Sequence, residues 1–493
     1  MTAAGEPIAP TPFWATPAGF AAIALLLSLP WLIVAGRLGL LPDESYYALW
    51  SMYPSSGYFD HSPGIAWIIA AGRWVLGEGA LPIRIVTNLL GLVTLVALYR
   101  LGVLLLADAR VGAMAGFFYA VSPAAAISFA VATPDGLSTS LWTLTLWAIA
   151  EFARGGRRSW WLAAGCFAGL GLLSKYTNIM LAPGILLYLL TGGERRRWLG
   201  LWQVWAAAGL ALLLFTPVLL WNAQHGWISF GFQLGRSSFT GEHGGPSLMP
   251  FLLFWVALAL LLLPPAFGLI AGGAVARLRK IAPEGLDLPL WTSLPIVAFF
   301  AVHSFTNTAN PNWLDPVFPP LMLAAGWAAV AMLGWSSAWA GRLLSALQIG
   351  LGALLLGVLA VSATLGEIPF VGQRAVVSYG RGWEGLATEL AAVARANGAG
   401  WIDTETYLLG SMIGYAAHVA GADIPVEQSN QPHRYTYRPG LPPEAKALPH
   451  LLVREVRSER RPRAPEGMQT LGVLTRRDGA HVLGHYAVFL SRP

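Results

Sequence analysis

Long apolar segments, separated by short polar ones, are the feature of this sequence that most constrains its fold. A helix of roughly 20 apolar residues can cross a membrane, because it satisfies its own backbone hydrogen bonds there. Only 11% of the residues are charged, against roughly 25% in soluble domains. The sequence therefore predicts an α-helical polytopic membrane protein and excludes an ordinary soluble enzyme. By this length criterion we count about eleven spans, near residues 18–40, 83–107, 112–131, 136–153, 160–174, 177–191, 202–221, 248–272, 288–303, 314–334 and 343–363.

The charges of the loops predict which way the chain crosses the membrane. Basic residues are concentrated in alternate loops, near 154–158, 195–197 and 277–280. Cytoplasmic loops carry an excess of lysine and arginine, so these loops and the N-terminus are predicted to face the cytoplasm of a bacterial inner (plasma) membrane. The same signals explain the net charge of +6, from 31 basic and 25 acidic residues, and we predict no nucleic-acid partner.

The composition divides the chain into three parts. Residues 1–17 form a short cytoplasmic lead, residues 18–363 form the membrane module, and residues 364–493 contain charged, polar and proline residues throughout. In the last part, residues 383–396 have the periodicity of a helix and residues 481–490 alternate as a strand does. Because an odd number of spans carries the chain outside, we expect a small α/β domain in the periplasm.

The first outward loop, residues 41–82, contains four acidic residues and one arginine. Asp43 and Glu44 lie at the outer end of the first span. Carboxylates at a membrane edge can be general bases or metal ligands, but an aspartate at the start of a helix is also a favoured cap. The pair alone does not separate these interpretations. Residues 61–77 are apolar but interrupted by Arg73, which is typical of a helix lying along the membrane interface.

Other ionisable groups lie on the same side of the predicted membrane. Asp60 and His61 form either a helix cap or a carboxylate beside a potential cation. Asp135 is explained locally by capping. Lys175 separates two apolar runs with no acidic residue nearby in the sequence. An ionisable group at membrane depth is a candidate functional residue, although a lysine can also extend its amino group to the interface.

Polar and aromatic side chains are mixed in the outward segments, including residues 222–247 and 303–316. Rings that stack on sugar faces, together with groups that bind hydroxyls, suit a carbohydrate ligand, although aromatic residues are also common at membrane interfaces. The sequence contains no HExxH, CxxC, Walker or GxSxG motif. It therefore gives no indication of zinc, ATP or serine-hydrolase chemistry.

Eight segments carry a resemblance to a known family. Five lie in the membrane module, namely LPDESYYALWS (41–51), GYFDHSPGIAWII (57–69), TPDGLSTSLW (133–142), LGLLSKYTNIMLAP (170–183) and NPNWLDPVFPPLML (310–323). Three lie in the C-terminal part, namely GWEGLA (382–387), DTETYLLGSMIGYAA (403–417) and QPHRYTY (431–437). In these segments the sequence resembles the GT-C glycosyltransferases. It is most similar to the bacterial branch of the dolichyl-phosphate-mannose protein mannosyltransferase family, which includes the lipid A aminoarabinose transferase.

This resemblance implies a GT-C fold and an inverting sugar transfer from a polyprenyl-phosphate donor, such as undecaprenyl phosphate, to an acceptor in the periplasm. Asp43 resembles the catalytic base, and Lys175 resembles the lysine that stabilises the leaving phosphate. Glu44 would orient the acceptor or hold Asp43, and Asp60 matches the acidic residue of the second motif. His61 stands where the aminoarabinose transferase has a phosphate-binding lysine, and a neutral imidazole is a weaker phosphate partner.

Further site residues are predicted from their location. The donor phosphate has the candidates Arg73, Arg84 and Arg236, and the sugar or acceptor has the candidates Tyr46, Tyr58, Asp135, His303 and Asn312. Asp43 with Glu44 could hold a divalent metal, but no third ligand accompanies them, so we predict no metal and no cofactor. The sequence does not identify the acceptor: lipid A, a surface glycan, a second lipid and a protein all remain open. By analogy, we expect residues 364–493 to be an acceptor-side lid.

Two other functions use the same features. A transporter or flippase for a lipid-linked sugar would carry ionisable residues in the middle of its spans and an inverted repeat. Here the charges gather at one face, and no repeat is visible. A polysaccharide ligase or polymerase would use a diphosphate-linked donor, for which we expect longer outward loops and more basic clefts.

Overall fold

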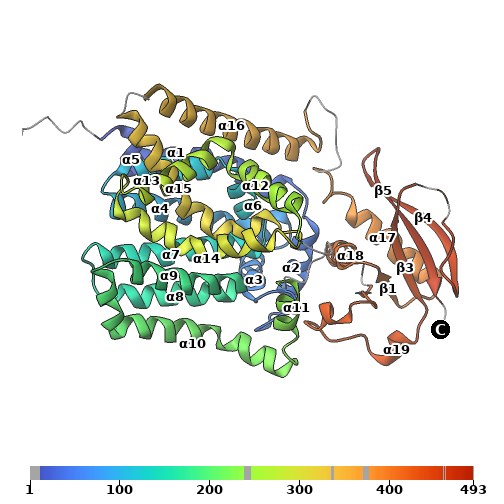
Figure 1. Ribbon diagram of the computed structural model, residues 1–493. Coiled ribbons are helices and arrows are strands. Elements are labelled where there is room, and N and C mark those ends of the chain that lie inside the picture. The colour runs from blue at the N-terminus through green and yellow to red at the C-terminus, as the bar shows by residue number, and fades with distance from the viewer. Residues whose placement is uncertain are drawn as a thin grey trace, which may run out of the picture.

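The computed structural model describes residues 11–237, 246–334, 338–369, 377–422, 424–458, 460 and 462–491. Figure 1 shows a large bundle of helices beside a smaller C-terminal part that contains a sheet. Most of the predicted N-terminal lead lies outside the described residues. This architecture confirms the predicted fold class, a helical membrane protein with a small C-terminal domain that contains a sheet, whereas the bounds of the predicted parts stay a prediction.

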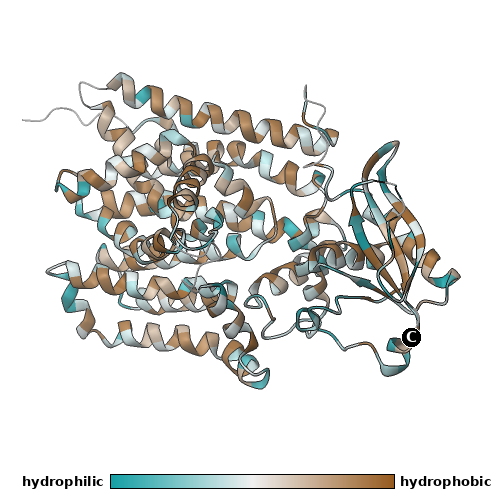
Figure 2. Cartoon of the chain, turned by 45° about the vertical axis from the view of Figure 1, so that its right-hand side comes forward, coloured by the Kyte–Doolittle hydropathy of each residue, from teal (hydrophilic) through white to brown (hydrophobic). Residues whose placement is uncertain are grey.

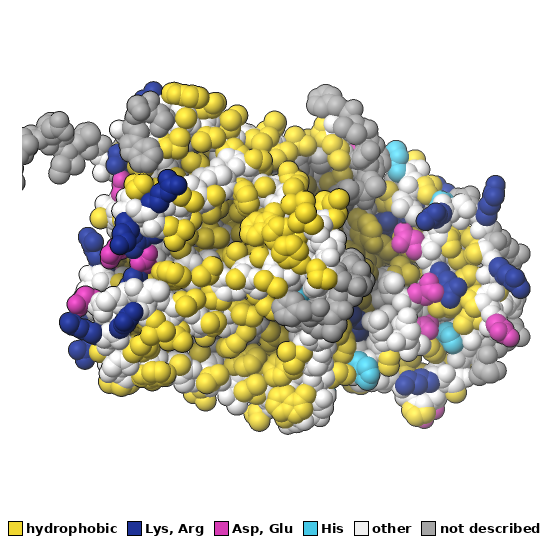
Figure 3. All heavy atoms as spheres, in the orientation of Figure 1, with side chains coloured by type: hydrophobic (Ala, Val, Ile, Leu, Met, Phe, Trp, Pro, Cys, Tyr) yellow, Lys and Arg dark blue, Asp and Glu magenta, His cyan; other side chains and the backbone are white. Residues whose placement is uncertain are grey.

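Helices account for every apolar segment that the sequence analysis selected. Residues along these helices are mostly hydrophobic, as Figure 2 shows, and apolar side chains cover much of the bundle's outer face in Figure 3. The chain is thus a multi-pass membrane protein. The helices of the bundle are α1 (Pro17–Arg37), α4 (Ala80–Leu106), α5 (Ala109–Ala120), α6 (Pro123–Phe129), α7 (Pro134–Ala153), α8 (Trp160–Ser174), α9 (Leu181–Thr191), α10 (Trp202–Gln224), α12 (Leu248–Leu262), α13 (Pro264–Leu278), α14 (Asp287–His303), α15 (Phe318–Leu333) and α16 (Ala338–Leu365).

The described helices that are long and apolar enough to cross a membrane are fewer than the eleven predicted spans. Among the described residues, 6 helices are long and apolar enough to cross a membrane, and two bent pairs raise this number to 8. Helices α5 and α6 meet at 73°, and helices α12 and α13 meet at 105°. Each second helix begins with a proline, Pro123 or Pro264. Proline has no N–H for the preceding turn and fits the first position of a new helix, so the sequence itself breaks these two segments.

The first outward loop folds into two short helices against the end of the bundle. These are α2 (Pro42–Met52) and α3 (Gly64–Leu76). On α3, Ile65 and Ile69 are buried, whereas Trp74 and Val75 are exposed. One apolar face thus packs on the protein while the other stays open, as expected for the helix predicted along the membrane interface.

The C-terminal part is a mixed sheet covered by helices. The predicted helix at residues 383–396 and the predicted strand at residues 481–490 are both present. Strands β2, β1 and β3 are parallel, and β3, β5 and β4 are antiparallel, in the order β2-β1-β3-β5-β4. Its elements are α17 (Trp383–Ala396), β1 (Trp401–Thr404), α18 (Tyr407–Val419), β2 (Val426–Glu427), the 3-10 turn η6 (Pro432–Tyr435), α19 (Pro443–Lys446), β3 (His450–Val456), β4 (Met468–Asp478) and β5 (His481–Ser491).

The two parts touch closely at a pair of glycines. Gly39 lies in the turn between α1 and α2, and Gly380 lies just before α17. A Cβ atom on Gly380 would lie 2.3 Å from the carbonyl carbon of Gly39 and 2.5 Å from the carbonyl oxygen of Leu40. Only glycine allows two backbones to approach this closely. The junction therefore fixes where the C-terminal domain sits above the end of the bundle.

Replacing Gly380 by alanine tests this junction. We expect Gly380→Ala to cost roughly 1–3 kcal/mol through overpacking, because the contacting atoms are backbone and cannot rotate away. The variant should have a lower thermal unfolding midpoint in detergent than the wild type. Gly385→Ala is the matched control, since a Cβ at Gly385 meets nothing within 4 Å. Equal midpoints for both variants would contradict the close approach.

Candidate active-site cavity

A cavity of about 220 Å³ lies where the outward loop, the bundle and the C-terminal domain meet. Side chains from eight separate stretches of the chain line it, and eight of the lining residues belong to the predicted site. Those eight are Asp43, Tyr46, Asp60, His61, Asp135, Lys175, Arg236 and Asn312. The remaining lining residues are Tyr47, Thr133, Pro134, Asn310, Trp313, Tyr407 and Arg434.

Asp43 faces the cavity and does not cap its helix. The free N–H of Leu41, just before α2, donates to Glu44 Oε2 at 2.9 Å, so Glu44 is the capping side chain. The interpretation of Asp43 as a cap is therefore wrong. Asp43 Oδ1 instead accepts a hydrogen bond of 3.1 Å from the Tyr407 hydroxyl. Burial is the main cause that raises the pKa of Asp43; the Tyr407 hydrogen bond opposes it, and the nearby charge of Asp60 adds to it.

Asp60 is held by residues from both parts of the protein. Its Oδ1 pairs with Arg434 Nη1 at 2.5 Å, and its Oδ2 accepts from the Tyr46 hydroxyl at 2.8 Å. Burial raises the pKa of Asp60, while the charge of Arg434 opposes the rise. The pKa of the neighbouring His61 falls to about 3, chiefly through burial and then through the charge of Lys175. His61 is therefore a neutral imidazole at ordinary pH, and the geometry does not favour it as a cationic phosphate group.

Lys175 has an acidic partner that the sequence did not reveal. Its Nζ lies 2.5 Å from Oδ1 of Asp135, a residue in the first turn of α7. Oδ2 of Asp135 accepts from Asn312 Nδ2 at 3.2 Å. Lys175 and Asp135 are both buried, so the pair neutralises two charges within the cavity wall. A lysine that merely extends to the membrane interface does not fit this arrangement.

Arg236 and Asp43 differ from the other charges of the cavity. Among the described residues, neither has an ion-pair partner, whereas Asp60 pairs with Arg434 and Asp135 with Lys175. Arg236 ends α11 (Ile228–Arg236), and its guanidinium lies 5.3 Å from the ring centre of Trp313. The cavity thus presents one carboxylate and one guanidinium whose charges are not offset by a partner in the described part of the chain.

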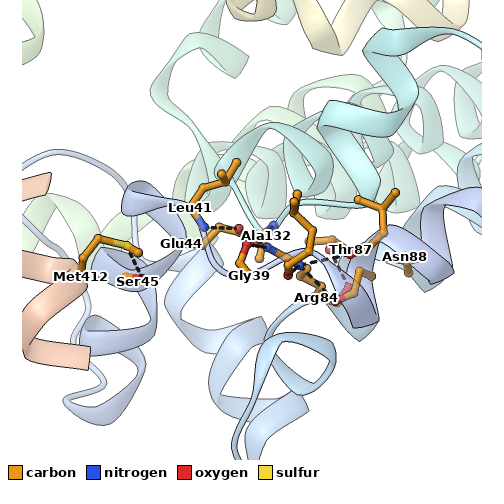
Figure 4. A network of polar contacts seen from close by, with 12 residues as sticks. Gly39, Leu41, Glu44, Ser45, Arg84, Thr87, Asn88, Ala132 and Met412 are labelled. Carbon is orange, nitrogen blue, oxygen red and sulfur yellow. Dashed lines mark hydrogen bonds and ion pairs between the residues drawn. The ribbon is translucent and has the colours of Figure 1, made fainter. Parts of the chain in front are cut away.

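Glu44 and Arg84 do not line the cavity. They belong to the polar network that Figure 4 shows. Both side chains are completely buried. Arg84, on α4, donates to both carboxylate oxygens of Glu44 at 2.6 and 2.5 Å, and to the carbonyls of Leu38 and Gly39 at 2.6 and 3.0 Å. The N–H of Ala132 donates to Glu44 Oε1 at 2.8 Å. This pair connects α1, α2, α4 and the segment before α7, and it does not support the predicted substrate contacts of either residue.

Three more predicted residues lie outside the cavity lining. Arg73 pairs with Glu78 and donates to Ser51 Oγ at 2.8 Å. The ring of Tyr58 stacks on Trp50 at 4.2 Å. His303 packs its ring against several aromatic neighbours, including Phe299 and Trp313. Their surroundings favour structural roles over donor or acceptor contacts.

Seven lining residues were not among the predicted site residues: Tyr47, Thr133, Pro134, Asn310, Trp313, Tyr407 and Arg434. Asn310 and Trp313 lie in the matched segment around Asn312, so a wider reading of that segment would have included them. Tyr407 and Arg434 lie in the C-terminal segments that carry the family resemblance, and Arg434 stands in the aromatic sequence QPHRYTY. The position of Arg434 among aromatic residues could have indicated it as a site residue.

The arrangement of carboxylates does not offer a shared metal site at Asp43 and Glu44. Both oxygens of Glu44 are bound by Arg84, and its side chain is buried away from the cavity. No cluster of three or more histidine, cysteine or acidic side chains that could hold a metal occurs in the described part of the chain. The absence of a metal requirement stays a prediction.

Breaking the Glu44–Arg84 pair should destabilise the fold. We expect Arg84→Met to cost about 3–5 kcal/mol, because it leaves the buried carboxylate of Glu44 without its partner. The double variant Glu44→Leu/Arg84→Met removes both charges and should lose less stability than Arg84→Met alone. Thermal unfolding of the purified variants in detergent measures the difference. A melting curve for Arg84→Met that superposes on the wild type would contradict this role.

Comparison with known proteins agrees with the fold. Residues 60–221 match the family model described as dolichyl-phosphate-mannose-protein mannosyltransferase. The chain is 25% identical to lipid A galacturonosyltransferase RgtD of Rhizobium johnstonii, over 58% of this chain and 59% of that protein. It is 29% identical to the undecaprenyl phosphate-alpha-4-amino-4-deoxy-L-arabinose arabinosyl transferase of Pseudomonas paraeruginosa, over 69% of this chain and 64% of that protein. The matches thus span about three fifths of the length of these relatives.

Solved structures show the same architecture. The crystal structure of ArnT from Cupriavidus metallidurans bound to undecaprenyl phosphate superposes with a TM-score of 0.60, at 15% identity, over 96% of this chain and 98% of that one. The oligosaccharyltransferase of Archaeoglobus fulgidus superposes with a TM-score of 0.53, at 14% identity, over 81% of this chain and 61% of that one. At these identities the likeness concerns the fold alone. The chain is therefore a membrane protein with the GT-C fold of these solved structures, and its residues 60–221 are similar to the dolichyl-phosphate-mannose-protein mannosyltransferase family.

Proposed function

We propose that this chain transfers a sugar from a polyprenyl-phosphate donor to an acceptor hydroxyl, with Asp43 as the general base. One observation carries the proposal: a single cavity presents a carboxylate, Asp43, together with a guanidinium, Arg236, and neither has an ion-pair partner among the described residues. The reaction needs one group that accepts a proton and one that binds a phosphate. The names of the two curated relatives, one a transferase for an undecaprenyl-phosphate sugar and the other a lipid A glycosyltransferase, support the same class of reaction.

The proposed step is a direct displacement at the anomeric carbon. Asp43 takes the proton of the acceptor hydroxyl, whose oxygen forms a bond to the anomeric carbon. The bond from that carbon to the phosphate oxygen breaks, and the polyprenyl phosphate leaves with the electron pair. Attack from the side opposite the leaving group inverts the anomeric configuration. The raised pKa of Asp43 favours the step, since a more basic carboxylate accepts the proton more readily.

Two cations are available to stabilise the leaving phosphate. The guanidinium of Arg236 can donate two parallel hydrogen bonds to phosphate oxygens. Lys175 has three N–H donors, and Asp135 accepts one of them, so the others can face the phosphate. We assign the first contact to Arg236, because its charge is not offset by a partner in the described residues. Lys175 then adds to the stabilisation as the developing charge appears.

The rest of the cavity wall suits a sugar. Tyr46, Tyr47 and Trp313 provide rings, and Asn310 and Asn312 provide amide groups for hydroxyls. The acceptor is inferred to be a lipid, since one relative is named for its action on lipid A. A transporter that leaves the donor intact is the alternative, and the experiments below separate the two.

The distribution of basic side chains supports a cavity outside the cytoplasm. In Figure 3, lysine and arginine gather at the end of the bundle that faces away from the C-terminal domain. Basic residues mark the cytoplasmic side of membrane proteins. The cavity lies at the other end, beside the C-terminal domain, so we infer that both face the periplasm of a bacterial inner membrane.

Loss of the base should abolish donor cleavage. Purified protein, in detergent with an envelope lipid extract, would be incubated with labelled polyprenyl-phosphate sugars, and the release of polyprenyl phosphate would be followed. We expect release by the wild type with one class of donor, and a rate lower by about 10³-fold or more in Asp43→Asn, which keeps the shape but loses the proton acceptor. Near-normal release by the folded variant would refute the base, and flux of intact lipid without release would favour the transporter.

Removal of the guanidinium should weaken the handling of the donor. We expect Arg236→Gln to lower kcat/KM for the donor by about ten- to hundred-fold, as for a lost charged hydrogen bond of about 1.5–3 kcal/mol. Arg279→Gln is the control, because Arg279 follows α13 and does not line the cavity. Equal kcat/KM values for the two variants would remove Arg236 from the phosphate site.

A further inference from the structure

The C-terminal domain contributes two side chains to the cavity. Tyr407 is the first residue of α18, and Arg434 lies in η6. The Tyr407 hydroxyl donates to Asp43 Oδ1 at 3.1 Å, across 364 residues of sequence. Arg434 pairs with Asp60 across 374 residues. The two carboxylates of the outward loop that line the cavity, Asp43 and Asp60, are thus both contacted by side chains of the C-terminal domain.

We propose that Tyr407 is a positioning residue that holds Asp43 in the orientation needed to accept the acceptor's proton, so that the C-terminal domain is part of the active site. This inference rests on the proposed function, in which Asp43 is the base. The hydroxyl of Tyr407 donates its hydrogen bond to Oδ1 of Asp43. The second oxygen, Oδ2, is then the one directed to the acceptor hydroxyl.

The position of Tyr407 is fixed from two sides. The Arg434 guanidinium lies over the Tyr407 ring, 4.1 Å from its centre, and is itself anchored by Asp60. Helix α18 also packs along α2, where Ser45 Oγ lies 3.1 Å from Met412 Sδ. The start of the helix that carries Asp43 and the start of the helix that carries Tyr407 are therefore held together. A hydroxyl placed this rigidly restricts the carboxylate at little entropic cost during the reaction.

The hydrogen bond also sets how readily Asp43 loses and gains its proton. Burial raises the pKa of Asp43, and the donated hydrogen bond opposes this rise because it stabilises the ionised form. Removing the hydroxyl should therefore raise the pKa further. The charged and titratable groups that surround Asp43 stay in place in this test. They are Glu44, Tyr46, Tyr47, Asp60, His61, Asp135, Lys175, Arg236 and Arg434.

The pH profile of the full-length enzyme tests the inference. Activity requires ionised Asp43, so kcat/KM for the labelled donor falls as the pH drops through the pKa of Asp43. For Tyr407→Phe, which removes only the hydroxyl, we expect the acid limb to move to higher pH by about one unit. We also expect kcat on the plateau to fall about tenfold with donor KM nearly unchanged, since the donor phosphate is bound elsewhere.

Two further variants distinguish a positioning role of Tyr407 from a folding defect. Tyr435→Phe is the matched control, because the Tyr435 hydroxyl is buried and has no hydrogen-bond partner in the described residues; its profile should match the wild type. Tyr407→3-fluorotyrosine keeps the shape and strengthens the donor, so its acid limb should move to lower pH. This variant tests the inference even if Tyr407→Phe folds poorly.

The outcomes distinguish this inference from the proposed function. Unchanged profiles for both Tyr407→Phe and Tyr407→3-fluorotyrosine, together with an inactive Asp43→Asn, would overturn the positioning role alone. An active Asp43→Asn would overturn the base and this inference together. Opposite shifts of the acid limb in the two Tyr407 variants, with Tyr435→Phe unchanged, would support it.

Discussion

The buried ion pair between Glu44 and Arg84 is the interaction on which the arrangement of the site depends. Two charges removed from water are costly unless nearly every hydrogen-bonding group is satisfied. Here the guanidinium binds both carboxylate oxygens and the carbonyls at the end of α1, while the N–H groups of Leu41 and Ala132 complete the carboxylate. The pair therefore fixes where α2 and α7 begin. Asp43 precedes Glu44, and Asp135 follows shortly after Ala132, so the pair helps to position two of the three cavity carboxylates.

Asp43 and Glu44 are adjacent in the sequence, but their side chains have different surroundings. Successive residues of a helix point about 100° apart. Glu44 thus turns into the protein, where it pairs with Arg84, while Asp43 turns to the cavity. The sequence located the pair correctly but could not tell which carboxylate is structural, because that depends on Arg84, 40 residues further on. The same limit explains why Arg84 was predicted near the phosphate.

Local patterns revealed the helices of the bundle, the helix and strand of the C-terminal domain, and most of the residues that line the cavity. Apolar length and periodicity are sufficient for the elements, and scarce charge in an apolar chain points to the site. The partners of those charges were not predictable, since Lys175 meets Asp135 and Asp60 meets Arg434 only through tertiary packing. The bends at Pro123 and Pro264 were predictable, because these prolines are visible in the sequence. The predicted number of spans did not take them into account.

The charged residues of the cavity fall into two groups, according to whether they form ion pairs. Asp60 with Arg434 and Asp135 with Lys175 form parts of the wall, whereas Asp43 and Arg236 face the same space without ionic partners in the described part of the chain. An enzyme that joins a hydroxyl to a sugar and releases a phosphate needs this separation of proton acceptor and phosphate partner. The C-terminal domain lines part of the cavity with Tyr407 and Arg434, which contact Asp43 and Asp60. Its role as an acceptor-side lid stays a prediction.

A structure of Asp43→Asn with an intact polyprenyl-phosphate sugar tests the account most directly, because the substitution should allow the donor to bind without being cleaved. The account predicts the phosphate against Arg236, the sugar between the aromatic rings of the cavity, and position 43 on the side of the anomeric carbon opposite the phosphate. A phosphate bound elsewhere, or a sugar outside the cavity, would contradict it.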